Sequence, residues 1–302
     1  MKTLNFMRFR HVATVLSLSL LLIAVVSLTM RGINFGLDFT GGTLLEVQYE
    51  TPVPTENVKA VLDTAGYRDV TVQNFGSETD VLVRMSEAFH DGLGNEVLTL
   101  LQDNAGDNSL TLMRSEFVGA SVGEELRDQG GIALLAALFV VMAYVAFRFQ
   151  WKFSLGAVLA LFHDVLIIIG LFALFQWEFD LNVLAALLAV IGYSLNDTIV
   201  VYDRIRENFR IERSGTPIEI MNGSLSQTLD RTLMTSATTV LVLIALFFLG
   251  GDIIHNFALA LIIGIVVGTY SSIYVAANLL LLLGISREDL LPPEVEEEES
   301  VP

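Results

Sequence analysis

A polar pair interrupts an apolar stretch that is long enough to cross a membrane. The pair is Asn196 and Asp197, in the run "VIGYSLNDTIVV". An ionised carboxylate at bilayer depth costs at least about 2.5 to 3.5 kcal/mol on insertion scales, so it requires a partner or an aqueous cavity. Asp197 precedes the interfacial Arg204 by seven residues, which places it about 10 Å inside the membrane. With Thr198 beside it, this part of the helix is polar enough to line a crevice.

A basic residue opens the next apolar stretch. Arg231 begins "RTLMTSATTV", in which hydroxyl side chains such as Thr235 can also bond to their own helix backbone. Because the two stretches cross in opposite directions, Asp197 and Arg231 approach the same third of the bilayer. Burial opposes ionisation of the carboxylate and the guanidinium favours it, so the pair is a candidate proton-operated switch. A fixed ion pair, or an arginine that extends into the headgroups, would account for the same residues.

A second ionisable pair lies in "LALFHDVLIIIG". It consists of His163 and Asp164, and Asp164 follows Lys152 by 12 residues, or about 18 Å of helix. That depth is near the midplane of the bilayer. The pair has two interpretations, which the sequence leaves open: a hydrogen-bonded pair that serves packing, or a member of a polar relay.

Composition supports a membrane protein and excludes several kinds of site. The 302 residues are 53% hydrophobic, with a mean hydropathy of +0.61, and contain no cysteine. Disulfides, zinc–thiolate centres and a nucleophilic cysteine are therefore excluded. The run "LDFTGGT" lacks the lysine and spacing of a phosphate-binding loop, and no metal cluster or triad is visible. We expect no enzyme and no cofactor. The net charge of −17 reflects acidic solvated surfaces and says little about partners. We expect no nucleic-acid partner.

The chain divides into four parts. We expect a cytoplasmic N-terminus and first span over residues 1–30, an external domain over 31–130, a five-span bundle over 131–284 and an acidic disordered tail over 285–302. The last span is expected to tilt or break near Gly264 and Gly268. The expected spans are approximately Val12–Met30, Gly131–Phe147, Phe153–Phe175, Leu181–Val201, Thr232–Leu249 and Phe257–Leu283.

Positive charges predict the orientation. If the N-terminus is cytoplasmic, 11 of the 17 Lys and Arg lie on the cytoplasmic side, and the short outer loops "QWEFD" and "GGDIIH" carry none. Both termini are then cytoplasmic and the 31–130 domain is external.

The external domain shows the alternation strand, helix, strand, strand, helix, strand. This βαββαβ order predicts a ferredoxin-like α+β unit, a fold that does not identify a function by itself. Ser121 and Glu124 stand in the spacing of a capping box, which predicts a short helix before the second span. The expected elements are strands 43–49, 70–75, 80–85 and 109–117 and helices 54–65 and 94–104.

Five motifs, in order, resemble those of the SecF subunits of SecD–SecF protein-export complexes. They are "NFGLDFTGGTLLEV", "FVGASVGEELR", "FHDV", "GYSLNDTIVVYDRIREN" and "DRTLMTSATT". Together with six spans and one external domain, the resemblance covers nearly the whole chain.

The resemblance implies an α-helical half-bundle similar to the resistance–nodulation–division (RND) transporters, in the bacterial inner membrane with the external domain in the periplasm. It implies a proton-driven accessory of the SecYEG translocon that pairs with SecD, with YajC or YidC as further partners, and acts on secretory preproteins among membrane lipids. The family's relay residues fall on Asp197 and Arg231, and SecD supplies a further aspartate. We predict supporting polar roles for Asn196, Thr198, Thr235, His163 and Asp164.

Two other functions remain open on sequence. One is a proton-coupled half-transporter for a lipid or small molecule, and the other is a translocon scaffold that moves no ion. The scaffold predicts that loss of the Asp197 and Arg231 charges leaves function intact. Sodium is an alternative coupling ion, because oxygen ligands from Asn, Asp and Thr also suit it.

Overall fold

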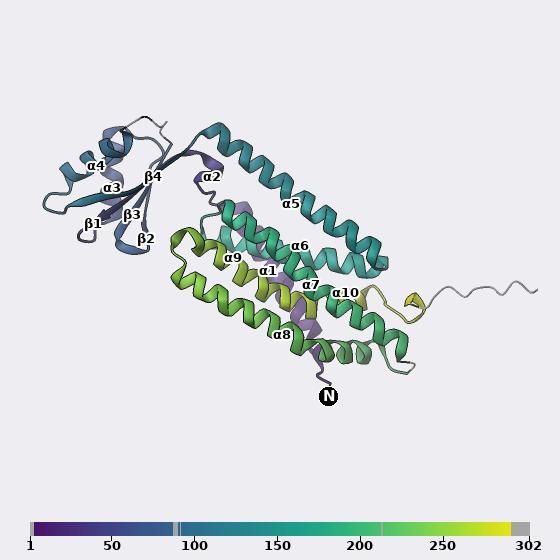
Figure 1. The fold of residues 1–302 in the computed structure, drawn as a ribbon. Coiled ribbons are helices and arrows are strands. Elements are labelled where there is room, and N and C mark those ends of the chain that lie inside the picture. The colour runs from purple at the N-terminus through teal and green to yellow at the C-terminus, as the bar shows by residue number, and fades with distance from the viewer. Residues whose placement is uncertain (1–2, 87–89, 91, 213, 291–302) are drawn as a thin grey trace, which may run out of the picture.

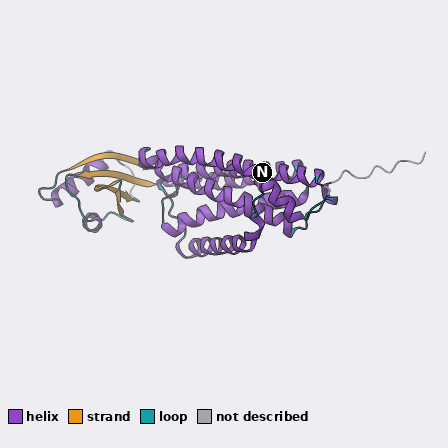
Figure 2. Ribbon diagram, turned by 90° about the horizontal axis from the view of Figure 1, so that it is seen from below, coloured by secondary structure: helices purple, strands orange, loops and turns teal. Residues whose placement is uncertain are grey.

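The chain forms a bundle of long helices with a small sheet domain at one end (Figures 1 and 2). A computed structural model describes residues 3–86, 90, 92–212 and 214–290. Within these residues, six segments are long and apolar enough to span a membrane, which confirms the predicted number. The bundle helices are α1 (Arg10–Arg31), preceded by the 3-10 turn η1 (Phe6–Phe9), α5 (Ala120–Arg148), α6 (Trp151–Phe175), α7 (Leu181–Ile211), α8 (Pro217–Leu249) and α9 (Asp252–Ser271), which continues through η2 (Ser272–Ala276) into α10 (Ala277–Leu282).

Helices α7 and α8 extend beyond the apolar stretches predicted for them, at the end of the bundle away from the sheet domain. We call this the terminal end, since α1 begins and α10 ends there (Figure 1). Helix α8 starts with Pro217 and a capping box, in which Thr216 accepts from the Glu219 N–H and Glu219 accepts from the Thr216 N–H. The polar extensions stay helical because each buries an apolar face against the other.

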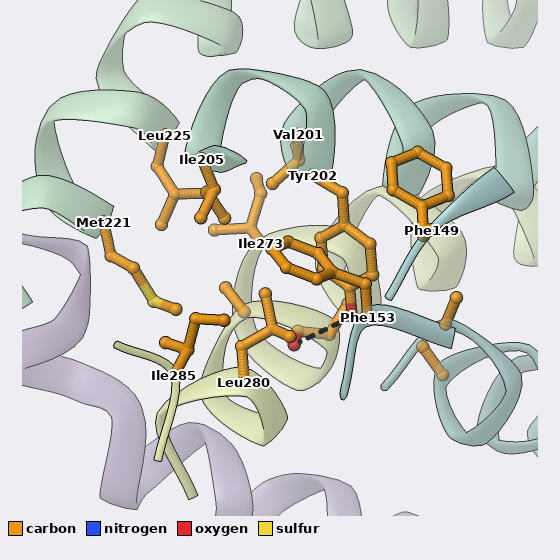
Figure 3. Close-up of a cluster of buried hydrophobic side chains, with 14 of the residues drawn as sticks. Phe149, Phe153, Val201, Tyr202, Ile205, Met221, Leu225, Ile273, Leu280 and Ile285 are labelled. Atoms are coloured by element: carbon orange, nitrogen blue, oxygen red, sulfur yellow. Dashed lines mark hydrogen bonds between the residues drawn. The ribbon is translucent and has the colours of Figure 1, made fainter. Parts of the chain in front are cut away.

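A hydrophobic cluster holds the terminal end together (Figure 3). Tyr202 of α7 is fully buried, its ring lies edge-on to Phe153 of α6 at 5.1 Å, and its hydroxyl donates to the carbonyl of Ala276 at 3.1 Å. Met221 and Leu225 of the α8 extension join the same cluster. This packing fixes the half of α7 at the terminal end of the bundle. The same helix carries Asp197.

The sheet domain has the predicted element order. Strand β1 pairs antiparallel with β3 and β4, and the sheet order is β2-β3-β1-β4. Both helices bury apolar side chains against one face of the sheet, where Leu45 and Val83 meet Leu62 and Val97. The elements are β1 (Gly42–Tyr49), α3 (Thr55–Ala65), β2 (Thr71–Phe75), β3 (Ser77–Met85), α4 (Leu93–Asn104) and β4 (Leu110–Val118).

A close junction of two glycines leads into the sheet. The single helical turn α2 (Leu37–Thr40) ends at Gly41 and Gly42, whose φ angles are 67° and 114°. A Cβ at Gly41 would lie 2.6 Å from the Cα of Ala120, and one at Gly42 would lie 2.6 Å from the carbonyl oxygen of Met85. Glycine is required here by both conformation and space, so this segment holds β1 against the start of α5.

Three local predictions differ from the structure, two in the helices of the bundle and one at the start of the expected tail. Ser121 and Glu124 form no capping box: α5 is one continuous helix with Gly119 as its N-cap and no side-chain cap bond, and it runs on through Gly130 and Gly131 into the span. The last span is unbroken at Gly264 and Gly268, and its irregularity is the π-helical turn η2, one turn further on.

The start of the expected tail is packed. Residues 285–290 include the 3-10 turn η3 (Glu288–Leu290), and Ile285 and Leu290 are buried in the terminal cluster. The rest of the expected tail, 291–302, lies outside the described residues.

Candidate functional site

Asp197 lies inside the bundle, on the side of α7 that faces α8 and α9. Its side chain is buried, with 3% of the residue exposed. The hydroxyl of Ser236, on α8, donates to this carboxylate, and Ser236 is also 2.8 Å from the hydroxyl of Thr269 on α9. A carboxylate and two hydroxyls from three helices therefore form one polar chain in an apolar surrounding.

Arg231 lies close enough to attract the Asp197 carboxylate electrostatically. The pair forms no direct ion pair within 4.0 Å in the part of the chain that the structure describes. Asp197 is buried whereas Arg231 is exposed on the outer face of α8. In the same described part, Oδ2 of Asp197 has no hydrogen-bond partner. The site thus holds the buried carboxylate of Asp197, which can accept a further hydrogen bond, and the long cationic side chain of Arg231 at its edge.

The supporting residues predicted beside this pair have different positions. Asn196 is exposed, on a face of α7 about 100° from that of Asp197, while Thr198 is buried at 2% exposure. Thr235 is exposed, and its hydroxyl donates to the carbonyls of Arg231 and Thr232 in its own helix. Thr235 therefore bonds to the backbone of its own helix, one of the roles predicted for the hydroxyl side chains of this stretch.

His163 and Asp164 form a second polar cluster, in the centre of the bundle. Oδ1 of Asp164 lies 2.9 Å from Nδ1 of His163, and Oδ2 accepts from Ser194 of α7 at 2.6 Å and from Ser271 of α9 at 2.7 Å. Asp164 is fully buried. Its bonds go to side chains on two other helices, so the pair ties α6, α7 and α9 together. Ser194 precedes Asp197 by three residues, which is less than one helical turn.

Two glycines allow α9 to approach α7 at this depth. A Cβ at Gly264 would lie 2.2 Å from Cγ2 of Val190, and a Cβ at Gly268 would lie 3.0 Å from Cβ of Ser194. Small residues four apart are a common device for close helix contact in membranes. The close contact brings Ser271 within reach of Asp164.

Sequence reasoning missed Thr269 and Ser271 as members of these clusters. Their signal was the polar run "TYSS" over 269–272 in the middle of the last apolar span. The run leads into the π-helical turn η2, which begins at Ser272, and such turns are frequent at functional sites.

The domain end of the bundle is joined to the sheet by polar contacts. Arg84 of β3 forms an ion pair with Glu178 and donates to the carbonyl of Phe35 at 3.0 Å. Asp38 accepts from the Leu181 N–H at 3.1 Å, at the first residue of α7. The sheet domain is therefore bonded directly to the helix that carries Asp197.

The N-cap of α7 belongs to this junction. Asp180 accepts from the Val183 N–H at 2.8 Å. Burial raises the pKa of Asp180, the Val183 N–H opposes that shift, and the carboxylates of Glu178 and Asp38 add to it. Protonation of Asp180 would therefore reduce the electrostatic repulsion among the three carboxylates at this junction.

Chemically, the bundle offers a carboxylate that can bind and release a proton beside a guanidinium that responds to its charge. Within the described residues no group of three or more His, Cys, Asp or Glu side chains is placed to hold a metal ion.

Two family models match the chain. The model for the C-terminal part of the protein export membrane proteins SecD/SecF matches residues 97–286, and the SecD/SecF GG motif matches residues 26–53. The protein translocase subunit SecF of Vibrio alginolyticus is 51% identical over 300 residues, covering 98% of this chain and 95% of the relative. The chain belongs to the SecF family.

Other SecF subunits have similar identity. The subunit of Pseudomonas aeruginosa is 52% identical, covering 98% of this chain and 96% of the relative, and that of Escherichia coli O157:H7 is 48% identical, covering 98% and 93%. The GG-motif match includes Gly41 and Gly42, which form the tight junction of α2 and β1. The longer match includes Asp164, Asp197 and Arg231.

The SecF assignment extends to solved structures. The crystal structure of SecDF, a translocon-associated membrane protein from Thermus thermophilus, matches with a TM-score of 0.85 at 40% identity. The match covers 93% of this chain and 38% of that chain, so the SecF-family chain spans about two-fifths of it. SecDF in its super-membrane-facing form matches with a TM-score of 0.70 at 39% identity, covering 94% and 39%.

Proposed function

We propose that this chain is a multi-pass subunit of the bacterial inner membrane that, with SecD, uses the proton motive force to promote late steps of preprotein export. It is an accessory protein, not an enzyme. One observation carries the coupling role: Asp197 is buried between three helices with an unpartnered oxygen, while Arg231 lies at the edge of the site. SecF-family membership supports the export role.

The coupling follows from electrostatics. When Asp197 is ionised, its negative charge attracts Arg231, and its carboxylate accepts a hydrogen bond from the hydroxyl of Ser236. Protonation removes the attraction, because a neutral carboxyl interacts weakly with a guanidinium. Arg231 then loses its attraction toward α7, and α8 shifts relative to α7. Since Asp38 binds the first N–H of α7 and Arg84 binds Glu178, the displacement reaches the sheet domain.

We assign the two termini to the cytoplasm and the sheet domain to the periplasm, as the distribution of Lys and Arg favours. SecD supplies the remaining relay carboxylate and packs on the exposed face of α7 that carries Gly192 and Asn196. The further partners are the SecYEG translocon, YajC or YidC, and the preprotein, which the sheet domain handles.

Sodium is the alternative coupling ion. The oxygens of Asp197, Ser236 and Thr269 are all of the kind that bind sodium. The experiment below therefore compares sodium and protons as the coupling ion. The lipid or small-molecule half-transporter and the ion-independent scaffold remain the alternative functions.

The test uses membrane vesicles that contain the chain, its SecD partner and the translocon. A pH gradient and a sodium gradient are imposed separately, and export of a preprotein is measured. We expect the pH gradient alone to stimulate export. Asp197→Asn should reduce export to the level without a gradient, because the carboxamide cannot titrate. Asp203→Asn, on the exposed cytoplasmic end of the same helix, is the matched control and should retain stimulation.

Three results would contradict the proposal. Stimulation by sodium alone would overturn the proton assignment. Full export and proton flux in Asp197→Asn would favour the scaffold. Gradient-driven movement of a lipid or small molecule with unchanged export would favour the half-transporter.

A further inference from the structure

Two adjoining hollows run along the outside of the bundle at its terminal end. The first, of about 480 Å³, lies at the helix ends, between the start of α1, the start of α8 and the residues after α10. The second, of about 310 Å³, lies deeper along α1, α6 and α10. Thr14, Asn278 and Leu282 line both, so the two hollows adjoin, and we call them together the groove.

The outer hollow has a mostly apolar lining with a basic edge. Arg10 and His11 line it, and Nε of Arg10 donates to Nε2 of His11 at 3.3 Å. Within the described residues, Arg10 has no carboxylate in ion-pair distance. The first turn of α8, at Pro217 and Ile218, contributes the positive end of a 33-residue helix to the same hollow. This end of the groove suits a phosphate group.

Two acidic groups of the described residues lie near the outer hollow, Glu219 and Asp289, and Asp289 is paired with Lys152. Glu219 follows Ile218 on α8, and its carboxylate accepts from the N–H and the hydroxyl of Thr216. Its charge is thus committed to the helix cap. It reduces the attraction for an anion at this end of the groove, and we expect a moderate headgroup preference for that reason.

The inner hollow is lined by apolar side chains at bilayer depth. Leu18 of α1 and Phe162 of α6 are 61% and 57% exposed on its rim. The neck between the two hollows is polar, where Asn278 donates to Thr14 at 3.0 Å. His163 also lines this hollow, and its Nε2 has no hydrogen-bond partner among the described residues.

We propose that this groove binds one anionic phospholipid from the leaflet at the terminal end, with its phosphate at Arg10 and one acyl chain along Leu18 and Phe162. Charge complementarity at the outer end and the apolar wall at the inner end, joined in one groove, match an amphiphile with a phosphate. A free phosphate would leave the inner hollow unused, and a neutral lipid would leave Arg10 unpaired. Basic pockets between helices at the cytoplasmic face are known to take anionic headgroups. The proposal goes beyond the export role, which determines only the leaflet that supplies the lipid.

The experiment is a lipid titration of the purified full-length chain in detergent, followed by native mass spectrometry. Phosphatidylglycerol and phosphatidylcholine with identical acyl chains are compared, and glycerol phosphate is added as a competitor. We expect one phosphatidylglycerol to bind at lower concentration than phosphatidylcholine, with no displacement by glycerol phosphate.

Four variants separate the two ends of the groove. Arg10→Gln should weaken phosphatidylglycerol binding about fivefold and leave phosphatidylcholine unchanged, since one cationic contact is lost. Leu18→Trp should weaken both lipids by filling the inner hollow. The matched controls Arg8→Gln and Leu22→Trp lie outside the groove on exposed positions and should bind as the unaltered chain does.

Three outcomes would overturn the proposal. Equal binding of the two lipids would remove the headgroup preference. Equal losses in Arg10→Gln and Arg8→Gln would show general surface attraction. Displacement by glycerol phosphate, with Leu18→Trp unaffected, would show an anion site without an acyl chain. Circular dichroism and gel filtration of each variant establish that a loss of binding is not a loss of fold.

Discussion

The hydroxyl of Ser194 donates to Oδ2 of Asp164 at 2.6 Å, three residues before Asp197 on the same helix. Ser271 donates to the same oxygen at 2.7 Å from α9. The carboxylate of α6 therefore sets the position of α7 close to the proposed proton site, and α9 is held in the same way. The hydrogen bonds of Asp164 to Ser194 and Ser271 therefore position Asp197, whether or not Asp164 takes part in proton transfer.

Removing a donor from this cluster should destabilise the bundle. Ser194→Ala leaves Asp164 with one fewer hydrogen bond in a fully buried position, and we expect a loss of about 1 to 3 kcal/mol in the free energy of unfolding. Denaturation in mixed micelles measures it. Ser19→Ala is the control: its hydroxyl is exposed and bonds only to the Val15 carbonyl among the described residues, so its loss should be within about 0.5 kcal/mol.

Ser194→Ala and Ser271→Ala should also be non-additive. Both hydroxyls donate to one oxygen, and residues that share a partner show interaction energies of about 0.5 to 3 kcal/mol in double-mutant cycles. Strict additivity would contradict the shared-acceptor geometry.

Alanine at Gly264 should force α9 away from α7. The added Cβ would lie 2.2 Å from Cγ2 of Val190, and we expect a loss of about 1 to 3 kcal/mol in unfolding free energy from overpacking. Gly223→Ala, in the buried part of α8 where no atom lies within 4 Å of the new Cβ, should be neutral or stabilising by up to about 1 kcal/mol. Equal effects of the two changes would contradict the close contact.

The packed segment after α10 should lose its attachment in acid. Lys152 donates to both carboxylate oxygens of Asp289, at 2.8 and 2.7 Å. This hydrogen bond holds the pKa of Asp289 below its ordinary value, with the N–H and hydroxyl of Ser286 adding to the effect against burial. A lowered folded pKa means that the stabilisation is present above the unfolded value, about 3.9, and is lost as pH falls through the folded pKa.

The measurement compares the thermal midpoints of the unaltered chain and Asp289→Asn between pH 7 and pH 3. The difference should be constant near neutrality and shrink below about pH 4 as the carboxylate protonates. Glu288→Gln, the neighbouring exposed acid, should show no such difference at pH 7. A difference between the unaltered chain and Asp289→Asn that persists unchanged to pH 3 would assign it to packing instead of charge.

The ion pair between the sheet domain and the bundle should be worth more than an exposed one. The side chains of Arg84 and Glu178 are 18% and 23% exposed, and Arg84 also donates to the Phe35 carbonyl. A double-mutant cycle with Arg84→Met and Glu178→Gln should give a coupling energy of about 1 to 2 kcal/mol. The exposed pair Lys59 and Asp63, on α3, should give about 0.3 to 0.5 kcal/mol. Equal coupling of the two pairs would show that the junction contact is loose.

The sequence by itself determined the number of spans and the order of elements in the sheet domain. Both depend on local signals: runs of apolar residues long enough for a bilayer, and alternation of strand and helix patterns. Strand 43–49 was predicted within one residue of β1, and the first helix of the domain within one residue of α3. Antiparallel spans and a fixed rise per residue also placed Asp197 and Arg231 near one depth from the sequence alone, and in the structure Arg231 is near enough to act on the Asp197 carboxylate electrostatically.

Only the tertiary structure decided which polar side chains meet. Ser194 and Ser271 are separated from Asp164 by 30 and 107 residues, and no local pattern indicates that their helices turn these faces toward α6. Asn196 and Asp197 are adjacent in sequence, yet one is exposed and the other buried, since neighbours on a helix point about 100° apart. The spacing of Ser121 and Glu124 matched a capping box, but the box requires the serine at the N-cap, and α5 has Gly119 there, two residues before Ser121.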